Sequence, residues 1–450
     1  MRGEGCPFSK PGDYWLLKKT LYGLRRSPRH WYKALSKALA DMGLVPCAHD
    51  PCMYTGKSQS GATIYVGIYV DDVIYYGSDD EAESWFETKL RKHITVNFMG
   101  AVSWYLGVYY EWGRTPDNLL TVHLSQEAHV HKLLEKEQLL ECIPATTPYR
   151  TGTPIDRIPH NGVSPDKKLT LIKRYQSALG GCVWLSTNTC PDITAWISLL
   201  VSHIQNPSEG HLQSARHLLK YLKGSADWGI RYTSPDPNAI DLSESRLRGE
   251  VQWPIGKPPA VETRQFVTHT DSNWGPQDAS APKDGELRSD DECRSLAGVA
   301  TLFMGGPLDW TAICEKRMSR SSCEAEIKAM DEGCKILEFI QHLFRELEVP
   351  DGKYPAPLLY NDNKGGVCWA LLEAITKKLR HLNIREVAIR DAVRNNDVVL
   401  GHIPGVLNFA DIFTKEMKDV QHFLNLRSAL MSPHILIPID DRPRHNQGGY

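Results

Sequence analysis

The stretch Ile64-Tyr65-Val66-Gly67-Ile68-Tyr69-Val70-Asp71-Asp72-Val73-Ile74-Tyr75-Tyr76 contains two apolar runs joined by a pair of adjacent aspartates. Every second residue from Ile64 to Val70 is aliphatic, which is the period of a strand that buries one face. A hairpin with Asp71 and Asp72 at its tip is therefore predicted. Two adjacent carboxylates repel each other unless a cation lies between them, so the pair indicates a divalent metal site. An acidic turn without metal is the alternative that this stretch leaves open.

The composition is that of a folded protein with more than one domain. A chain of 450 residues is long enough for two or three domains, and its 41% hydrophobic and 24% charged residues are typical of soluble proteins. No apolar run approaches the roughly 20 residues that a helix needs to cross a bilayer, and the first residues lack the pattern of a signal peptide. We therefore expect an intracellular protein with no membrane partner. The 11 cysteines include no CxxC pair, which indicates reduced thiols.

Two local runs of basic residues stand out in a chain whose formal net charge is only −2. The first run consists of Lys10, Lys18, Lys19, Arg25, Arg26, Arg29, Lys33 and Lys37. The second consists of Lys377, Lys378, Arg380, His381, Arg385, Arg390 and Arg394. Such runs are typical of surfaces that bind nucleic-acid phosphates, and a solvated helix face is the alternative.

Hydrophobic periodicity and turn residues divide the chain into parts. Residues 1–126 predict a helix, the hairpin, a second helix and short strands, which is an α+β arrangement on an antiparallel sheet. Residues 127–232 predict a set of helices, and residues 233–263, rich in Pro, Ser and acidic side chains, predict a linker. Residues 264–431 predict a mixed α/β domain, and residues 432–450 predict a disordered tail.

Acidic residues mark the ends of the elements predicted in the mixed domain. They are Asp271 and Asp362 at the ends of the first and fourth strands, Glu326 early in a long helix predicted at 322–347, and Asp411 at the start of the last helix. If the two strands are neighbours, these carboxylates meet, and a cluster of like charges is costly to assemble without metal. The pattern predicts a site with two Mg²⁺ (or Mn²⁺) ions for phosphodiester hydrolysis. Glu324 is a rival to Glu326, but Ser321-x-x-Glu324 has the spacing of a capping box.

Eleven blocks of this sequence match one known family in the family's own order. They are Leu21–Tyr32, Asp50–Tyr54, Tyr69–Asp72, Tyr105–Val108, Leu124–Gln126, Tyr175–Gly180, Cys190–Ile193, His217–Gly224, Asp271–Trp274, Ser322–Glu326 and Ala410–Lys415. From about residue 14 to 430, the chain resembles the C-terminal part of a copia-type retrotransposon Pol polyprotein, in which reverse transcriptase precedes ribonuclease H. Any one block alone is a weak signal, whereas all of them in order are specific.

The resemblance implies a role for each part of the chain. Residues 1–126 would be a partial reverse-transcriptase palm and fingers, 127–232 a helical thumb and connection, and 264–431 a ribonuclease H-like domain. Asp71 and Asp72 resemble the metal-binding pair of the polymerase palm. The block Leu21–Tyr32 resembles the segment that lines the nucleotide and template site.

The same resemblance, with the basic runs, names the candidate site residues. The catalytic and metal-binding set is Asp71, Asp72, Asp271, Glu326, Asp362 and Asp411. The nucleic-acid-binding set is Arg25, Arg26, Arg29, Lys377, Lys378, Arg380 and Arg385. We expect the basic run after Asp362 to follow the phosphates of an RNA–DNA hybrid or primer–template.

One departure from the family affects the expected activities. The family carries a further palm aspartate on a strand upstream of Leu21–Tyr32, and this chain begins after that point. Because two-metal phosphoryl transfer needs ligands on both ions, we expect a truncated palm without polymerase activity and a ribonuclease H that cuts hybrid RNA. One alternative is an element remnant that binds nucleic acid without catalysis. Another is a fragment of a longer polyprotein whose upstream part supplies the strand. The product would act in the cytoplasm, in a virus-like particle or in the nucleus.

Overall fold

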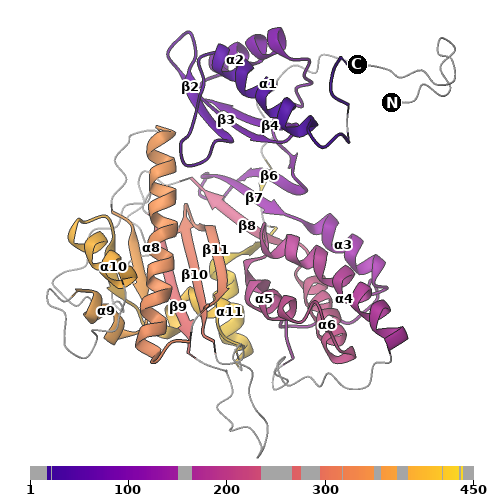
Figure 1. Ribbon diagram of the computed structural model, residues 1–450, viewed down its shortest axis with the longest axis vertical. Coiled ribbons are helices and arrows are strands. Elements are labelled where there is room, and N and C mark those ends of the chain that lie inside the picture. Colours follow the sequence, from indigo (N-terminus) through magenta and orange to yellow (C-terminus); the bar gives the residue numbers. More distant parts are fainter. Residues whose placement is uncertain are drawn as a thin grey trace, which may run out of the picture. The chain divides into compact units, whose positions relative to one another are not determined.

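The computed structural model describes residues 18–21, 23–150, 165–234, 266–274, 294–316, 318–348, 356–371, 384–417, 419–434 and 437–438. The chain forms two compact units, one made of residues 1–100 and 340–352 and the other of residues 101–339 and 353–450 (Figure 1). In the described part of the chain, no helix is both long and apolar enough to cross a membrane. Residues 235–263 of the predicted linker and residues 439–450 of the predicted tail lie outside the described residues.

The first unit is an antiparallel sheet with two helices packed on it. Its elements are α1 (Ser27–Asp41), β1 (Val45–Pro46), β2 (Met53–Lys57), β3 (Thr63–Tyr69), β4 (Asp72–Gly77) and α2 (Asp80–His93). The strands lie in the order β1-β2-β3-β4. Ile64, Val66 and Ile68 of β3 are buried in one core with Leu39 of α1 and Phe86 of α2. The predicted hairpin and its buried face are therefore confirmed.

The second unit contains a mixed sheet with the strand order β11-β10-β9-β12-β13. Its strands are β9 (Val267–Asn273), β10 (Leu296–Phe303), β11 (Gly306–Cys314), β12 (Leu358–Asn361) and β13 (Val399–His402). Both β9 and β11 are antiparallel to β10, whereas β12 is parallel to β9 and to β13. Together with the long helix α8 (Ser322–Glu346), this strand order forms the ribonuclease H-like α/β fold that the resemblance implied.

Helix α8 packs closely on this sheet because of a glycine. At Gly333 the helix backbone comes so near the sheet that a β-carbon would lie 2.8 Å from side-chain atoms of Thr270 in β9 and Leu359 in β12. A larger side chain would push the helix away from the sheet. The elements that follow α8 are α9 (Lys364–Leu371), α10 (Ile384–Arg394), the 3₁₀ helices η5 (Gly405–Leu407) and η6 (Phe409–Phe413), and α11 (Val420–Leu430).

The second unit also holds helices and another sheet. They comprise α3 (Glu127–Lys136), α4 (Pro165–Ser186), η2 (Pro191–Ile193), α5 (Thr194–Ser202), α6 (Glu209–Gly224), β5 (Trp104–Tyr105), β6 (Val108–Arg114), β7 (Leu120–Ser125), β8 (Trp228–Thr233), β14 (Ser432–Pro433) and β15 (Ile437–Pro438). The sheet has the order β14-β8-β7-β6-β15, and β5 pairs with β6. The helical and antiparallel parts of the predicted fold class are thus present.

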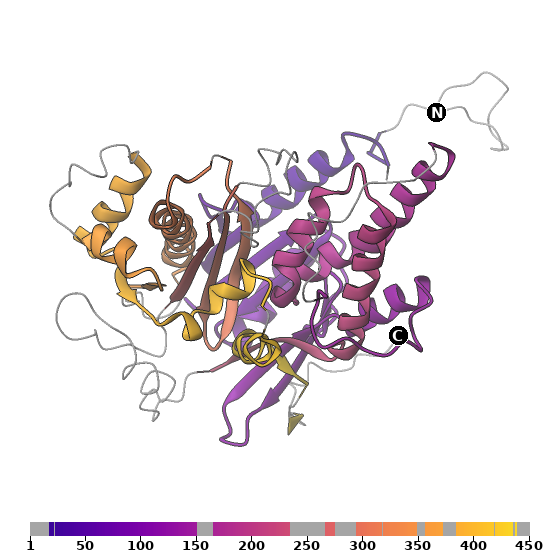
Figure 2. The same cartoon turned by 90° about the horizontal axis from the view of Figure 1, so that it is seen from below.

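One hydrophobic core joins these helices to the ribonuclease H-like part. It contains Leu133 of α3, Tyr175 of α4 and Leu218 of α6, together with Phe413 of η6 and Phe423 of α11. Figure 2 shows α11, in yellow, near the magenta helices. The finer division into palm, thumb, linker and nuclease domains stays a prediction.

Several elements differ from the sequence-based expectation. Residues 432–433 and 437–438, which were predicted as part of a disordered tail, form β14 and β15, paired with β8 and β6. Asp271 does not end its strand, because β9 continues to Asn273 by pairing with β10. Asp411 does not begin the last α-helix: it lies in η6, and α11 begins at Val420. Strand β8 was not predicted, since six residues between a helix and a Pro-rich stretch show no clear alternation.

Candidate active site

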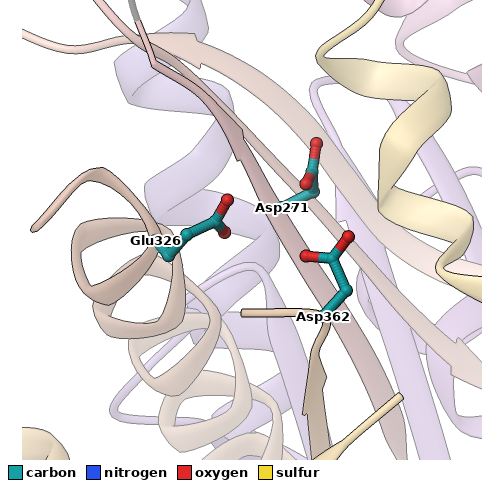
Figure 3. A group of neighbouring side chains, drawn as sticks. All are labelled: Asp271, Glu326 and Asp362. Carbon is teal, nitrogen blue, oxygen red and sulfur yellow. The ribbon is translucent and has the colours of Figure 1, made fainter. Parts of the chain in front are cut away.

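Three carboxylates from three elements point toward one another in the second unit (Figure 3). Asp271 lies in β9, Asp362 directly follows β12, and Glu326 lies in the first turns of α8. The parallel register pairs Thr270 with Asn361, so Asp271 and Asp362, the residues that follow them, stand side by side. One oxygen atom of each carboxylate lies within 4.8 Å of the others. The predicted meeting of these three side chains is what the structure shows.

The start of α8 sets the position of Glu326. Ser321 Oγ accepts a hydrogen bond from Glu324 N at 3.1 Å, and the Glu324 carboxylate accepts one from Arg320 N at 2.8 Å. Helix capping is therefore confirmed as the role of Glu324. Glu326 faces the sheet, where Asn361 Nδ2 donates to its Oε2 at 2.9 Å.

Asp411 approaches the cluster from η6. Asn408, the N-cap of η6, donates from Nδ2 to Thr270 O at 2.9 Å, which ties this short helix to β9. Lys415 Nζ then donates to Asp411 Oδ1 at 2.7 Å and to Asp271 Oδ1 at 3.1 Å. The carboxylate of Asp411 is therefore linked to that of Asp271 through the ammonium group of Lys415.

The carboxylates raise one another's pKa values. Burial, and then the charge of Asp271, raises the pKa of Glu326 to about 9. The same two causes raise the pKa of Asp411 to about 7 and lift the pKa of Asp362 above its usual value. For Lys415, burial opposes the charge, but Asp271 and Asp411 raise its pKa above the usual value. Negative charge is in excess, and a divalent cation would neutralise it.

The donor set of the cluster fits a hard divalent cation. All of its ligand atoms are carboxylate oxygens, which Mg²⁺ and Mn²⁺ prefer. Asp271 and Glu326 are buried and Asp362 is half-buried. Burial of the carboxylates increases the cost of their mutual repulsion.

The aspartate pair of the first unit lies at the turn between β3 and β4. Tyr69 pairs with Asp72, so Val70 and Asp71 form the loop of the hairpin. Val70 has a φ of 55°, a left-handed conformation that is strained for a β-branched residue. Trp31 Nε1 of α1 donates to Val70 O at 2.7 Å and stabilises this turn. Both aspartates are exposed, and their metal-binding role stays a prediction.

The predicted nucleic-acid-binding residues are described in part. Those that are exposed around the start of α1 are Arg25, Arg26 and Arg29. Those that lie outside the described residues are Lys377, Lys378 and Arg380. Arg385 is in α10. Their contact with nucleic acid stays a prediction.

Arg390 departs from its predicted place in the basic run. It is buried rather than exposed. Its guanidinium carbon lies 4.0 Å from the centre of the Trp369 ring, and Arg390 Nη2 donates to Trp369 O at 3.0 Å. Arg390 therefore holds α10 against α9, and the prediction that it follows phosphates is wrong.

Three polar residues that contact the acids were not predicted as site residues from the sequence. The Thr414 hydroxyl donates to the Asp271 carboxylate, Lys415 bridges Asp271 and Asp411, and Asn361 contacts Glu326. Lys415 follows Asp411 by four residues, a spacing typical of ion pairs on a helix. That spacing was the signal in the sequence that could have identified Lys415.

Comparison with known proteins shows which proteins the chain is similar to. Residues 5–151 match the family model described as reverse transcriptase (RNA-dependent DNA polymerase). The retrovirus-related Pol polyprotein from transposon TNT 1-94 of Nicotiana tabacum is 22% identical over 399 residues, covering 89% of this chain and 27% of that protein. The corresponding polyprotein from transposon RE1 of Arabidopsis thaliana is 25% identical over 411 residues, covering 91% of this chain and 24% of that protein. The chain is related to the copia-type Pol polyproteins.

The chain spans about a quarter of the length of the curated relatives it matches. Among solved structures, the N-terminal ribonuclease H domain of Rv2228c from Mycobacterium tuberculosis aligns with 37% of this chain and 98% of its own, at 13% identity and a TM-score of 0.23. The chain is thus similar to the copia-type Pol polyproteins over most of its length, and its first third matches the reverse transcriptase model.

Proposed function

We propose that the second unit hydrolyses the RNA strand of an RNA–DNA hybrid with the help of a divalent metal ion. The observation that carries this proposal is the cluster of Asp271, Glu326 and Asp362, whose oxygens lie within 4.8 Å of one another on the ribonuclease H-like sheet. Excess negative charge at a shared position favours binding of a hard cation. The family relationship supports a phosphodiester as the substrate.

The residues of the cluster would divide the work. A bound Mg²⁺ or Mn²⁺ would polarise the phosphate and favour deprotonation of an attacking water. Asp271, Glu326 and Asp362 would hold the ion, and Asn361 would keep the Glu326 carboxylate turned toward it through the 2.9 Å hydrogen bond. Lys415 would hold Asp411 and Asp271 together through its two hydrogen bonds.

The substrate class follows from the family and from charge. Recognition of the 2′-hydroxyl distinguishes the RNA strand of a hybrid from DNA. The basic residues predicted in the run from Lys377 to Arg385, after Asp362, would bind phosphates, and the exposed arginines around the start of α1 would contact primer–template. In the first unit, Asp71 and Asp72 would be the palm metal ligands.

A cleavage assay on a labelled RNA–DNA hybrid with Mg²⁺ tests the proposal. We expect Asp362→Asn to lower the cleavage rate at least about 100-fold, since loss of an outer-shell partner alone typically costs roughly 10- to 100-fold. Asp391→Asn is the control, because Asp391 is an exposed acid on α10. Absence of cleavage by the wild-type chain, or full activity of Asp362→Asn, would contradict the proposal.

The second candidate is binding of nucleic acid without catalysis. The exposed Arg25, Arg26 and Arg29 favour it, because clustered exposed arginines bind phosphates whether or not the acids react. A chain in which Asp271, Glu326, Asp362 and Asp411 are all replaced by their amides separates the two. Under the binding hypothesis, wild type and variant bind primer–template equally and neither cleaves hybrid.

A further inference from the structure

A lysine occupies one side of the acidic cluster. Lys415 Nζ lies 2.7 Å from Asp411 Oδ1 and 3.1 Å from Asp271 Oδ1. The two carboxylates are nearly inaccessible, with 1% of the Asp271 side chain and 11% of the Asp411 side chain exposed. The ammonium group therefore bridges two buried acids.

The position of Lys415 is fixed by its neighbours in the chain. The amide nitrogens of Thr414 and Lys415 donate to Asp411 O at 3.2 and 3.1 Å. The Thr414 hydroxyl donates to the other oxygen of Asp271. Two residues later, Met417 N donates to the buried Tyr149 hydroxyl at 2.6 Å. Because both ends of this segment are anchored, Lys415 is directed at the acids by the backbone.

Asp271 therefore takes part in two chemically different contacts. Glu326 and Asp362 offer further oxygens, which is a ligand set for a cation. The Lys415 ammonium lies at hydrogen-bonding distance from both Asp271 and Asp411 and occupies the space between these two acids. A divalent ion there would need oxygen atoms at about 2.0–2.2 Å and would be repelled by the ammonium charge.

We propose that Lys415 takes the place of a second metal ion, so that one divalent ion binds at Asp271, Glu326 and Asp362. This inference rests on the proposed function and specifies its metal requirement. Lys415 is then a positioning residue: it holds Asp411 and orients Asp271 with a charge that belongs to the chain. The two-ion site expected from the sequence becomes a site with one ion and one lysine.

Counting bound Mn²⁺ tests the inference without an activity measurement. The reference is the full chain carrying Asp71→Asn and Asp72→Asn, so that the hairpin acids do not contribute ions. Calorimetric titration with MnCl₂, and electron paramagnetic resonance of free Mn²⁺, give the number of ions bound. We expect one ion for the reference and two after Lys415→Met is added, because the space between Asp271 and Asp411 becomes available.

The matched control is Lys335→Met. Lys335 also bridges two acids, Asp331 at 2.6 Å and Glu332 at 2.9 Å, elsewhere on α8. This variant should bind one ion, as the reference does. Adding Asp411→Asn to the Lys415→Met chain should return the number from two to one, which places the second ion at Asp411.

Either of two results would overturn the inference. The first is binding of two Mn²⁺ ions by the reference, and the second is binding of only one Mn²⁺ ion by the Lys415→Met variant. If Lys415→Met does not fold, Asp411→Asn in the reference decides: a more than tenfold loss of Mn²⁺ affinity would show that Asp411 is a ligand. If the reference binds one ion and the Lys415→Met variant binds two, but the wild-type chain does not cleave hybrid, the proposed function is rejected and the inference is kept. A reference that binds no Mn²⁺ rejects both.

Discussion

At the scale of single residues, Asp271 is the side chain on which the site depends. It receives hydrogen bonds from Thr414 and Lys415 and lies beside Glu326 and Asp362. Burial is the largest cause of the raised pKa values of Glu326, Asp362 and Asp411, and the charge of Asp271 is the second largest. The like charges therefore destabilise the metal-free protein, and a bound cation, as proposed above, would relieve this repulsion.

Glu326→Gln should separate stability from metal binding. The glutamine oxygen can still accept from Asn361, but the variant lacks a buried carboxylate beside Asp271. We expect the metal-free chain to be more stable by about 1 kcal/mol and to lose most of its stabilisation by MgCl₂. Thermal unfolding with and without MgCl₂ measures both effects. Glu332→Gln on the same helix is the control, and an equal response to MgCl₂ in all three chains would contradict this prediction.

His123 should make stability depend on pH. Burial lowers its pKa below the usual value of about 6.5. Between that value and the lowered one, the unfolded chain binds a proton that the native chain does not. The contribution of His123 to the free energy of unfolding is therefore fully present above about pH 6.5. It falls as the pH drops, by up to about 1.4 kcal/mol per pH unit.

Melting temperatures at pH 7.5 and 5.5 test the contribution of His123. The difference between the two pH values should shrink in His123→Gln. It should stay unchanged in His131→Gln, since the His131 side chain on α3 is 56% exposed. An unchanged difference in His123→Gln would show that other groups set the pH dependence.

At the scale of elements, the close approach of η6 to β10 completes the site. Gly298 in β10 pairs with Asp271 in β9. A β-carbon at Gly298 would lie 2.8 Å from Phe413 Cβ and from Thr414 Cγ2. The absence of a side chain therefore lets η6 lie on the strand, and this brings Asp411 and Lys415 to Asp271.

Gly298→Ala should displace η6 and weaken the site. We expect a loss of about 1–3 kcal/mol of stability and lower Mn²⁺ affinity, measured by thermal unfolding and calorimetry. Gly180→Ala is the control, because a β-carbon at this position in α4 has no neighbour within 4 Å. That variant should gain about 0.5–1 kcal/mol. Equal behaviour of the two variants would refute the role of close packing at Gly298.

The sequence predicts some of these elements better than others. The alternation around Ile64 and the position of Asp362 after a strand depend on local patterns, which a sequence contains. The partners of Lys415 and Arg390 depend on tertiary packing, by η6 on β10 and by α10 on Trp369. Such contacts leave little signal in the local sequence. Charge alone therefore led to the prediction that Arg390 is exposed, and no role was predicted for Lys415.

At the scale of the whole molecule, the helices from residue 127 onward and the ribonuclease H-like part depend on each other. Leu218 and Tyr175 share a core with Phe413 and Phe423. The Tyr221 hydroxyl donates to buried Asp192 and accepts from Arg427 of α11. A ribonuclease H-like domain cut out at residue 264 would expose the apolar side of η6 and α11.

Fragments of the chain test this dependence. Residues 101–450 should fold and bind Mn²⁺, because they contain the whole second unit. Residues 264–450 should bind a hydrophobic dye and lack a cooperative melt, since exposed core surface favours partly folded states. Near-ultraviolet circular dichroism and dye fluorescence measure both. A sharp melt of the shorter fragment would show that the domain is independent.

The shared core also bears on how such a gene decays. Phe423 and Leu426 of α11 complete a core that includes Val130 near the start of the second unit. A nonsense mutation before α11 would remove these side chains and abolish the nuclease even where the codons for Asp271, Glu326, Asp362 and Asp411 survive. Under the proposed function, nuclease activity therefore requires an uninterrupted reading frame from about codon 101 to codon 430. A measurable activity would then report that this frame is intact.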